Sequence, residues 1–539
     1  MRTLIFCFTS ATALACVSSA CSSSTDDCHK LSNCPPSGGS SGSGGDAGTS
    51  GTSGTRGSSG ASGGAGHGGA SGSGGSGASA GNGNAGSSGM AGDAGAGGDV
   101  IPPCDATKSP SVEACVVSND YAIFVAPTGK DTAVGTTTAP VKTIAKAVEL
   151  AGATKIVIAC DGAYDEQVKL TSGAKLYGGF SCPGSVMPWT YEAGKKATVA
   201  PSARGLALSI ASSASSVVIE DFEFDAQDGV DPGESSVAAF VNASSNVAVT
   251  RVKLVAGKGV DGANGSLSPV TFPAQTTLNG HAATGDTAGP FNLVMCLAGG
   301  STKGGVGGNG GGAASGGGLG LPDLAMGKGG VQGSCSPNGT GQDGANAVSQ
   351  LPASGAMKLG TITPTGWSGV SGADGAPGTP GQGGGGGTGA ATGGGGGGGG
   401  AGGCGGAGGT GGKAGGSSIA LLVLNSTLTM TANELVAVSA GKGGSGFVGQ
   451  SGQTPGGSAG VQVPDGCGGG KGGAGGAGGA GGGAAGGISA GIAYVSATVP
   501  TPDSATTITT GPAGAKGVGG VPGTNDGIAG VKQDVLQVL

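Results

Sequence analysis

The side chains best suited to chemistry lie close together just before the middle of the chain. They are six carboxylates, Glu220, Glu223, Asp225, Asp228, Asp231 and Glu234. The first three alternate along the outward face of an expected strand, where carboxylates can ligate calcium or form a general acid/base pair. The matching positions of the next strand hold Thr250 and Lys253, so no carboxylate cluster extends across both. We therefore expect a solvated acidic face, with no catalytic and no metal-binding residue.

Other constellations that could do chemistry are missing from the sequence or poorly matched. The three histidines have no metal-ligand spacing and no C-x-x-C pair occurs, which argues against zinc and against a Ser-His-Asp triad. The segment 408–416, GGTGGKAGG, departs from a phosphate loop because Ala414 stands where Ser or Thr should hold magnesium. The net charge is −7 and no basic stripe is present, so we expect no nucleic-acid partner and no cofactor.

The strand that carries the carboxylates belongs to a repeat, which occurs at 205–229, 236–259 and 418–443. Each copy starts with a small or apolar run, passes through Ser- and Asn-rich residues, enters an alternating apolar strand and closes on glycine. A weaker fourth copy spans 488–499 and leads into 504–510. Short strands that recur about every thirty residues indicate a solenoid of stacked coils.

Period-two alternation predicts which side chains of these coils face inward. For the first two copies they are Val217, Ile219, Phe222 and Phe224, and Val247, Val249, Val252 and Leu254. Both sets point inward if the chain bends once in each copy, at Asp221 and at Arg251. The inward residues of the third copy, which fits less closely, are Leu428, Met430 and Leu435.

A short helix is expected over 143–151, ahead of the coils. Its apolar face would consist of Val141, Ile144, Val148 and Ala151. Pro140 suits the first helical turn. An amphipathic helix here would cover the open end of the solenoid core and block edge-to-edge association. The alternative is an ordinary surface helix.

The segment 121–180 carries a family resemblance. Its elements, in order, are FVAPTGKD (124–131), a GT…AP turn (135–140), TIAKAVELA (143–151), KIVIACDGAY (155–164), a valine/leucine strand and LYGGF (176–180). This order resembles the entrance to a right-handed parallel β-helix of the pectate-lyase-like superfamily, and is similar to a bacterial family of unknown function that opens in the same way. The resemblance is continuous over 121–256. It implies an all-β fold, a right-handed parallel β-helix with an N-terminal capping helix, interrupted by long Gly-rich inserts.

The N-terminus predicts export. The apolar stretch 4–17 is too short for a permanent transmembrane helix and is typical of a secretory signal. Residues from Cys21 onward resemble the start of a mature bacterial lipoprotein, which implies a lipid on Cys21. Ser18 departs from the usual leucine three residues before the cysteine. Ordinary cleavage after Ala20, giving a secreted protein, is the alternative.

Glycine is concentrated in three regions, 37–100, 257–416 and 441–487. The first is expected to be a disordered linker, because Gly, Ser and Ala cannot bury enough surface to fold. For the other two, disorder is the leading expectation and packed polyglycine-II-like helices are the alternative. A collagen triple helix is rejected because 372–381 holds too few triplets. The composition alone resembles the glycine-rich repeats of mycobacterial PE-PGRS proteins.

The cysteines agree with an oxidising compartment. Two of the 13 lie in the signal, and lipidation of Cys21 would leave ten. Pairing of neighbours would give the bridges Cys28–Cys34, Cys104–Cys115, Cys160–Cys182, Cys296–Cys335 and Cys404–Cys467. Connectivity does not follow from sequence, so this order is a hypothesis.

These features predict a chain of eight parts. They are a signal peptide (1–20), a lipidated Cys-containing segment (21–36), a linker (37–100), a capped β-helix (101–256), an insert (257–416), a coil (417–440), a second insert (441–487) and a terminal coil with tail (488–539). We expect a structural or adhesive protein without catalysis, on the outer membrane or cell surface, held to the membrane by its lipid. Surface polysaccharide or protein is the expected partner. The alternatives are a polysaccharide lyase or hydrolase on the same fold and a glycan-binding module.

Overall fold

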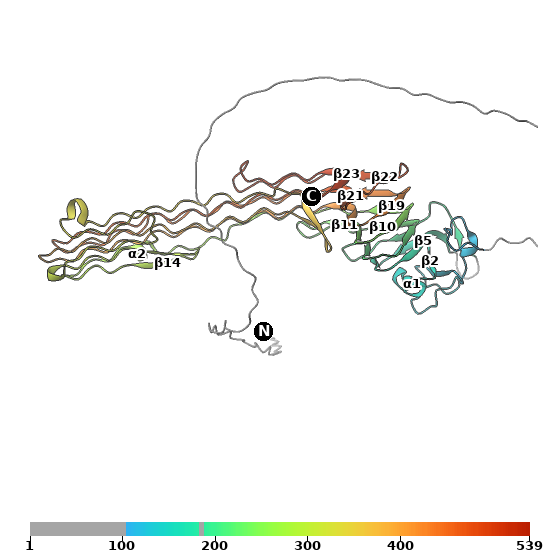
Figure 1. The fold of residues 1–539 in the computed structure, drawn as a ribbon, viewed down its shortest axis with the longest axis horizontal. Coiled ribbons are helices and arrows are strands. Elements are labelled where there is room, and N and C mark those ends of the chain that lie inside the picture. Colours follow the sequence, from blue (N-terminus) through green and yellow to red (C-terminus); the bar gives the residue numbers. More distant parts are fainter. Residues whose placement is uncertain (1–103, 183–187, 539) are drawn as a thin grey trace, which may run out of the picture. The chain divides into compact units, whose positions relative to one another are not determined.

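The computed structural model describes residues 104–182 and 188–538, which form a parallel β-helix and a bundle of glycine-rich segments (Figure 1). The expected signal peptide, the lipidation residue Cys21, the linker 37–100 and the cysteines Cys28 and Cys34 lie outside the described residues.

Three sheets form the wall of the β-helix. The first sheet orders β1 (Ala122–Val125), β2 (Ile156–Cys160), β5 (Ala174–Ser181), β9 (Val217–Glu220), β12 (Val247–Thr250) and β19 (Leu428–Thr431), all parallel, with β6 (Thr190–Tyr191) antiparallel to β5. The second sheet orders β3 (Gly162–Tyr164), β7 (Ala197–Val199), β10 (Phe222–Asp225), β13 (Lys253–Val255), β20 (Glu434–Ala437) and β22 (Thr507–Thr510). The third sheet orders β4 (Val168–Leu170), β8 (Leu208–Ala211), β11 (Ser236–Asn242), β18 (Ser418–Leu424), β21 (Ser489–Val495) and β23 (Lys532–Gln537). The chain thus visits the three sheets in turn, one coil after another.

The predicted register of the coils is confirmed. Val217 lies opposite Val247, Ile219 opposite Val249, and Phe224 opposite Leu254. The third copy follows the same register, with Leu428 on Val247, Met430 on Val249 and Leu435 on Leu254. Phe222 and Phe224 are fully buried and their rings stack at 5.6 Å between centroids. The alternating apolar positions therefore build one continuous core.

Single residues with positive φ turn the chain at the corners. Asp221 and Arg251, the two predicted bends, have φ of 56° and 53°, and Ala432 repeats this with 53°. Positive φ is costly for residues other than glycine, so such corners need support from neighbouring coils. The corner before the first sheet shows this support: the N–H of Ser244 donates to the hydroxyl of Ser426 at 3.0 Å.

The expected capping helix is α1 (Ile144–Ala151). Its buried residues Ile144, Ala147 and Ala151 join the core of the β-helix, so it closes the first coil as predicted. Thr143, and not Pro140, provides the N-cap by accepting a hydrogen bond from the N–H of Lys146. Pro140 precedes the helix and lies in the turn before it, so its predicted place in the first helical turn is wrong.

All glycine-rich inserts leave the β-helix at the same corner, between the second and the third sheet. The connection β10–β11 is short, whereas 256–417 joins β13 to β18, 438–488 joins β20 to β21, and 511–531 joins β22 to β23. Because these coils are stacked, the inserts start beside one another and run side by side away from the β-helix (Figure 1).

The inserts are ordered as polyglycine-II-like strands, so the leading expectation of disorder is wrong for the described residues. Consecutive residues of the segment 394–416 donate to different segments: Gly397 to Cys467, Gly398 to His281 and Gly399 to Gly305, at 3.0, 2.9 and 2.8 Å. The cycle restarts at Gly400, which donates to Gly470. A period of three, with bonds made to neighbouring segments, is the geometry of a three-fold extended helix.

Two antiparallel hairpins and several short helical turns complete the structure. The hairpins are β14 (Leu293–Met295) with β15 (Ser301–Lys303), and β16 (Gly360–Thr363) with β17 (Gly366–Gly369). The helical turns are Ala114–Val116, α2 (Gln275–Leu278), Gly311–Ala313 and Cys335–Gly339. The second hairpin packs Ile362 and Trp367 against the outer face of the third sheet, on Phe240 and Leu422. The first belongs to the glycine-rich bundle (Figure 1).

Four disulfides occur in the described residues. Cys104–Cys115 and Cys160–Cys182 agree with the expected pairing of neighbours. The remaining four cysteines pair as Cys296–Cys404 and Cys335–Cys467, so the expected bridges Cys296–Cys335 and Cys404–Cys467 are wrong. The glycine-rich segments fold back on one another, and this brings cysteines 108 and 132 residues apart into contact.

Candidate functional site

A cluster of charged side chains surrounds the corner between the first and second sheets. Arg251 donates from Nε and Nη2 to the two carboxylate oxygens of Asp221, both at 2.8 Å, and from Nη2 to Glu220 at 3.0 Å. The side chain of Asp221 is only 3% exposed. Tyr191 donates its hydroxyl to Asp221, and Lys196 donates to the backbone oxygen of Arg251. The hydrogen bonds to Asp221 raise the pKa of Arg251 above its ordinary value, so the guanidinium stays charged.

The ion pairs continue along the outer face of the second sheet. Lys253 lies in register with Glu223 on one side and with Glu434 on the other, and its Nζ is 2.7 Å from Glu223. Negative and positive side chains therefore alternate from coil to coil. Cross-strand pairs of this kind stabilise a sheet.

The expectation of a solvated acidic face is wrong for Glu220 and Glu223. Their side chains are 13% and 21% exposed, and both are paired with a cation from the next coil. From the sequence alone, Lys253 in the next strand argues against a carboxylate cluster. In the structure β10 and β13 are parallel and place Lys253 directly beside Glu223, so Lys253 is its ion-pair partner.

Asp225 is the carboxyl of this face without a cation of its own. Its Oδ1 is buried and has no hydrogen-bond partner, and its neighbour in the next coil is Val255. Burial, followed by the charge of Glu223, raises the pKa of Asp225 to about 6. Among the three predicted carboxylates Glu220, Glu223 and Asp225, this raised pKa is the one feature that suits acid/base chemistry near neutral pH.

The acidic turn after this strand is structural. Asp228 accepts the N–H of Lys258 at 2.7 Å. Arg204 binds both Asp231 and Glu234, at 2.9 and 2.6 Å. These groups hold neighbouring turns together.

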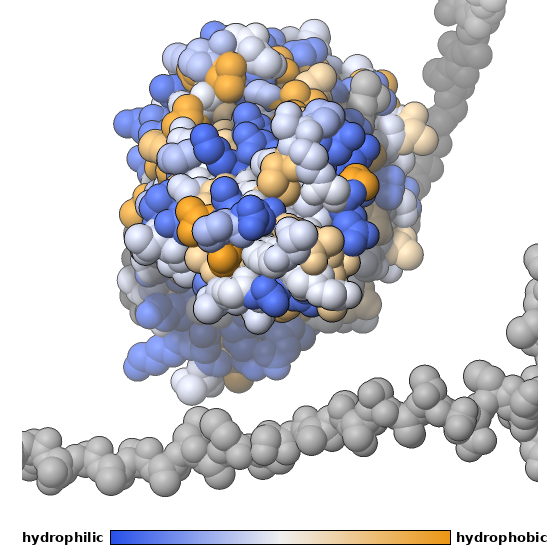
Figure 2. Space-filling view, turned by 90° about the vertical axis from the view of Figure 1, so that its left-hand side faces the viewer, coloured by the Kyte–Doolittle hydropathy of each residue, from blue (hydrophilic) through white to orange (hydrophobic). Residues whose placement is uncertain are grey.

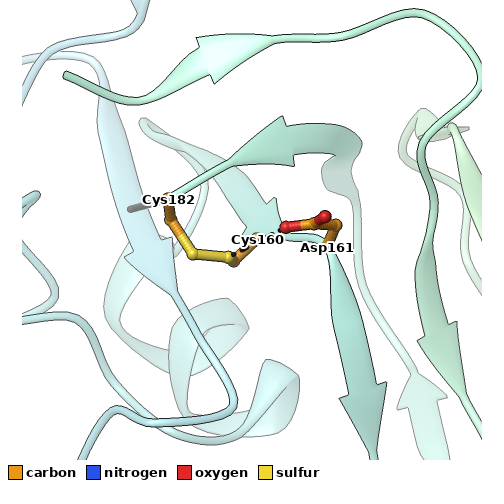
Figure 3. A group of neighbouring side chains, drawn as sticks. All are labelled: Cys160, Asp161 and Cys182. Carbon is orange, nitrogen blue, oxygen red and sulfur yellow. Dashed lines mark hydrogen bonds between the residues drawn. A yellow bond between two sulfur atoms is a disulfide. The ribbon is translucent and has the colours of Figure 1, made fainter. Parts of the chain in front are cut away.

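Cys160, Asp161 and Cys182 form the one group in the described residues with the spacing of a metal site, their ligand atoms lying within 4.8 Å of one another (Figure 3). Zinc would need cysteine thiolates. Both sulfurs are instead joined in a disulfide, and Asp161 pairs with Lys195 at 3.1 Å. The group therefore fits a covalent clamp between β2 and the end of β5 and does not fit a metal.

Two cavities lie near the capped end of the β-helix. One, of about 320 Å³, is lined by Lys130, Thr137 and Trp189, and the indole N–H of Trp189 already donates to the carbonyl of Thr137. The other, of about 290 Å³, contains Asp131 and Glu166. Asp131 accepts the N–H of Thr143, and Glu166 accepts the first two N–H groups of α1, so these carboxylates cap the helix.

The end of the molecule formed by the glycine-rich bundle shows no concentrated site. Figure 2 looks onto this end, where hydrophobic and hydrophilic residues are interspersed. Along the described part of the chain, no helix has the length and apolar character needed to cross a membrane.

The comparisons with known proteins bear on the capped end of the β-helix. Residues 127–221 match a family described as "Protein of unknown function (DUF1565)". The match runs from the turn before α1 to the corner residue Asp221, and the family is associated with parallel β-helix proteins. This agrees with the resemblance to a bacterial family of unknown function and with the parallel sheets. Neither the curated proteins nor the solved structures include a match to the chain.

Proposed function

We propose that this protein is exported, anchored by a lipid on Cys21, and acts at the cell surface as a structural or adhesive element without catalytic activity. The observation that supports this best is the bundle of hydrogen-bonded glycine-rich strands, which grows from one corner of the β-helix and is closed by two long-range disulfides. Four disulfides in the described residues fit an oxidising compartment. A repetitive, rigid scaffold offers an extended binding face and needs no catalytic group.

The anchor is tested by fractionation. Cys21→Ser should move the protein from the membrane fraction to the soluble exported fraction, whereas the neighbouring control Ser22→Ala should not. Mass spectrometry of the mature N-terminus should find the lipid on Cys21. An unmodified Cys21 would reject the lipoprotein proposal and leave simple secretion.

The adhesive role is tested on cells. A strain lacking the protein should attach less to surfaces or to neighbouring cells, and the full chain should restore attachment. Digestion of intact cells by an added protease should remove the protein if it lies outside the outer membrane. Unchanged attachment in the deletion strain would reject the adhesive role.

A second candidate, a carbohydrate-active enzyme, is favoured by one observation. Asp225 has a pKa of about 6 and neighbours Glu223, as a general acid beside a second carboxylate would. The pectate-lyase-like resemblance implies polysaccharide as the substrate class. We expect the purified protein to show no turnover of acidic or neutral polysaccharides, with or without calcium. Turnover that is lost in Asp225→Asn would establish the enzyme instead, and binding without turnover would indicate a glycan-binding module.

A further inference from the structure

Three stretches of the glycine-rich bundle expose large apolar side chains, here together called the leucine face. Its members are Phe291, Leu293, Met295, Leu297, Leu319, Leu321, Leu324, Met326, Val348 and Leu351, each between 40% and 84% exposed. Single exposed apolar residues are common, but a grouped set on a soluble protein marks an interaction surface.

The first part of the leucine face is one side of a small sheet. Leu293 lies opposite Lys303 in the hairpin β14–β15, and Lys303 in turn bridges to Leu321. Directly opposed residues of antiparallel strands share a face. The alternate residues Val294 and Thr302 are buried, so the exposed leucines point away from the bundle.

The second part continues across the next segments. Gly320 donates to Gly327, and Gly327 donates to Asp343, which places 319–322, 326–330 and 341–345 side by side. Leu324, Val348 and Leu351 then line one groove of about 490 Å³. The leucine face therefore spans five neighbouring segments. Four of these segments also share hydrogen bonds with the strand 383–387, through Gly305, Gly318, Gly330 and Gln342, so the face curves around that strand.

Charges around the leucine face are balanced in sign. Lys303, Asp323, Lys328 and Asp343 lie among or beside its members, and none of the four has an ion-pair partner within the described residues. Lys303 instead lies over the ring of Phe291 at 4.2 Å. An anionic membrane surface selects for cations alone. Equal numbers of both signs suit a surface that meets a copy of itself, where each lysine can face an aspartate.

We propose that the leucine face is a contact between two copies of this chain related by a two-fold axis. The apolar side chains form the centre, and the four charged residues form the rim. A standard interface buries about 800 Å² on each partner and uses about 20–30 residues a side. The segments 291–303, 319–328 and 343–351 together contain enough residues for one side of such an interface. This inference concerns the described residues and does not depend on the adhesive role.

The test is the oligomeric state of the exported chain made soluble by Cys21→Ser. Sedimentation over a range of concentrations should show a monomer–dimer equilibrium. Leu321→Lys and Val348→Lys should each raise the dimer Kd about tenfold or more, because each places a charge in the apolar centre. Val230→Lys is the matched control, since Val230 is 68% exposed but lies in a β-helix turn, and it should leave the Kd unchanged.

Thermal denaturation of each variant separates loss of association from loss of folding. The melting temperature of the folded chain should not change in either lysine variant.

A second experiment tests the rim: Lys328→Glu and Asp323→Lys should each weaken the homodimer, and mixing the two variants should give a heterodimer. A wild-type chain that stays monomeric would overturn the proposal, as would dimers that both lysine variants leave intact. Binding of the monomer to vesicles of phosphatidylcholine and phosphatidylglycerol would assign the face to lipid instead.

Discussion

Arg251 and Asp221 each turn the chain at the same corner of successive coils, and they also neutralise each other. Both residues have positive φ, and the bidentate hydrogen bond between the guanidinium and the carboxylate joins the corners of adjacent coils. The bend positions followed from the alternation of apolar residues. The ion pair did not, because a one-dimensional pattern shows which side chains face outward without showing which of them meet across coils.

Arg251→Met should destabilise the protein strongly. Asp221, whose side chain is 3% exposed, would lose its ion-pair partner, and breaking such a pair costs on the order of 3 kcal/mol. The double variant Asp221→Asn/Arg251→Met should recover part of the loss, since Asn tolerates positive φ and carries no charge. Chemical denaturation measures both. Equal stability of the single variant and the wild type would show that solvent compensates the charge.

Asp225→Asn should stabilise the protein at neutral pH and have little effect in acid. The folded-state pKa of Asp225 is raised from 3.8 to about 6, so its favourable contribution is complete below pH 3.8 and is lost as the pH rises through 6. Above that pH the folded state must hold a partly buried charge, which Asn removes. Thermal denaturation at pH 4, 5.5 and 7.5 should show the difference growing with pH. The control is Asp120→Asn, because Asp120 is exposed and lies in the turn before β1. A difference independent of pH would refute the raised pKa.

At the scale of elements, the β-helix coils and the glycine-rich strands differ in how local their sequence signals are. A β-helix coil can be recognised from the alternation of inward apolar residues with outward residues over a few positions, as at Val217 and Ile219. A glycine-rich strand has no such signal, because its hydrogen-bond partners lie far away along the chain: Gly400 bonds to Gly470, and Gly398 to His281. Composition alone therefore left disorder and packed strands as competing expectations.

The packed strands also explain why two residues in three are glycine over 401–412. A Cβ at Gly402 would overlap the carbonyl oxygen of Gly381, and one at Gly403 would overlap that of Gln453. At the third position of each three-residue turn there is room for a side chain, and Ala401, Cys404 and Ala407 occupy this position. Glycine is thus required here by close approach between backbones.

Gly402→Ala should loosen the bundle, because the backbone of a neighbouring strand must move away and lose hydrogen bonds. Gly312→Ala is the matched control, since a Cβ at Gly312 meets no atom within 4 Å. Hydrogen exchange should show faster exchange across 394–416 in the first variant only. Protection equal to that of the wild type would mean that the strands are not packed as described.

At the scale of the whole molecule, pairing each cysteine with its neighbour in sequence predicts the correct disulfides only where residues close in sequence are also close in space. Cys160 and Cys182 lie at the ends of neighbouring strands of the first sheet. Cys404 meets Cys296 because an insert folds back on itself, and Cys467 meets Cys335 because two inserts pack together. The fold of the coils was predictable from sequence, whereas the assembly of the inserts was not.

Removing the Cys296–Cys404 bridge with two serines should destabilise the bundle more than the β-helix. Closing a loop of 108 residues is worth about 4–5 kcal/mol in the chain-entropy model. Thermal unfolding should lose cooperativity, with an early transition assigned to the bundle by proteolysis. Peptide mapping without reduction should link Cys296 to Cys404 and Cys335 to Cys467. Peptides that link Cys296 to Cys335 would contradict the arrangement.

The shared exit corner of the inserts gives this architecture a route for evolutionary growth. An insertion between a second-sheet strand and a third-sheet strand leaves the register of both strands untouched when it falls beyond the buried corner residues Ala226 and Ala256, which still belong to the core. Each added out-and-back pair of glycine-rich segments finds ready partners in the insert of the coil above or below. Duplications of a simple glycine codon pattern could therefore thicken or lengthen the projecting bundle while selection on the β-helix stays constant. Related chains should then differ mostly in the length of these connections, while their coil corners and core positions stay in register.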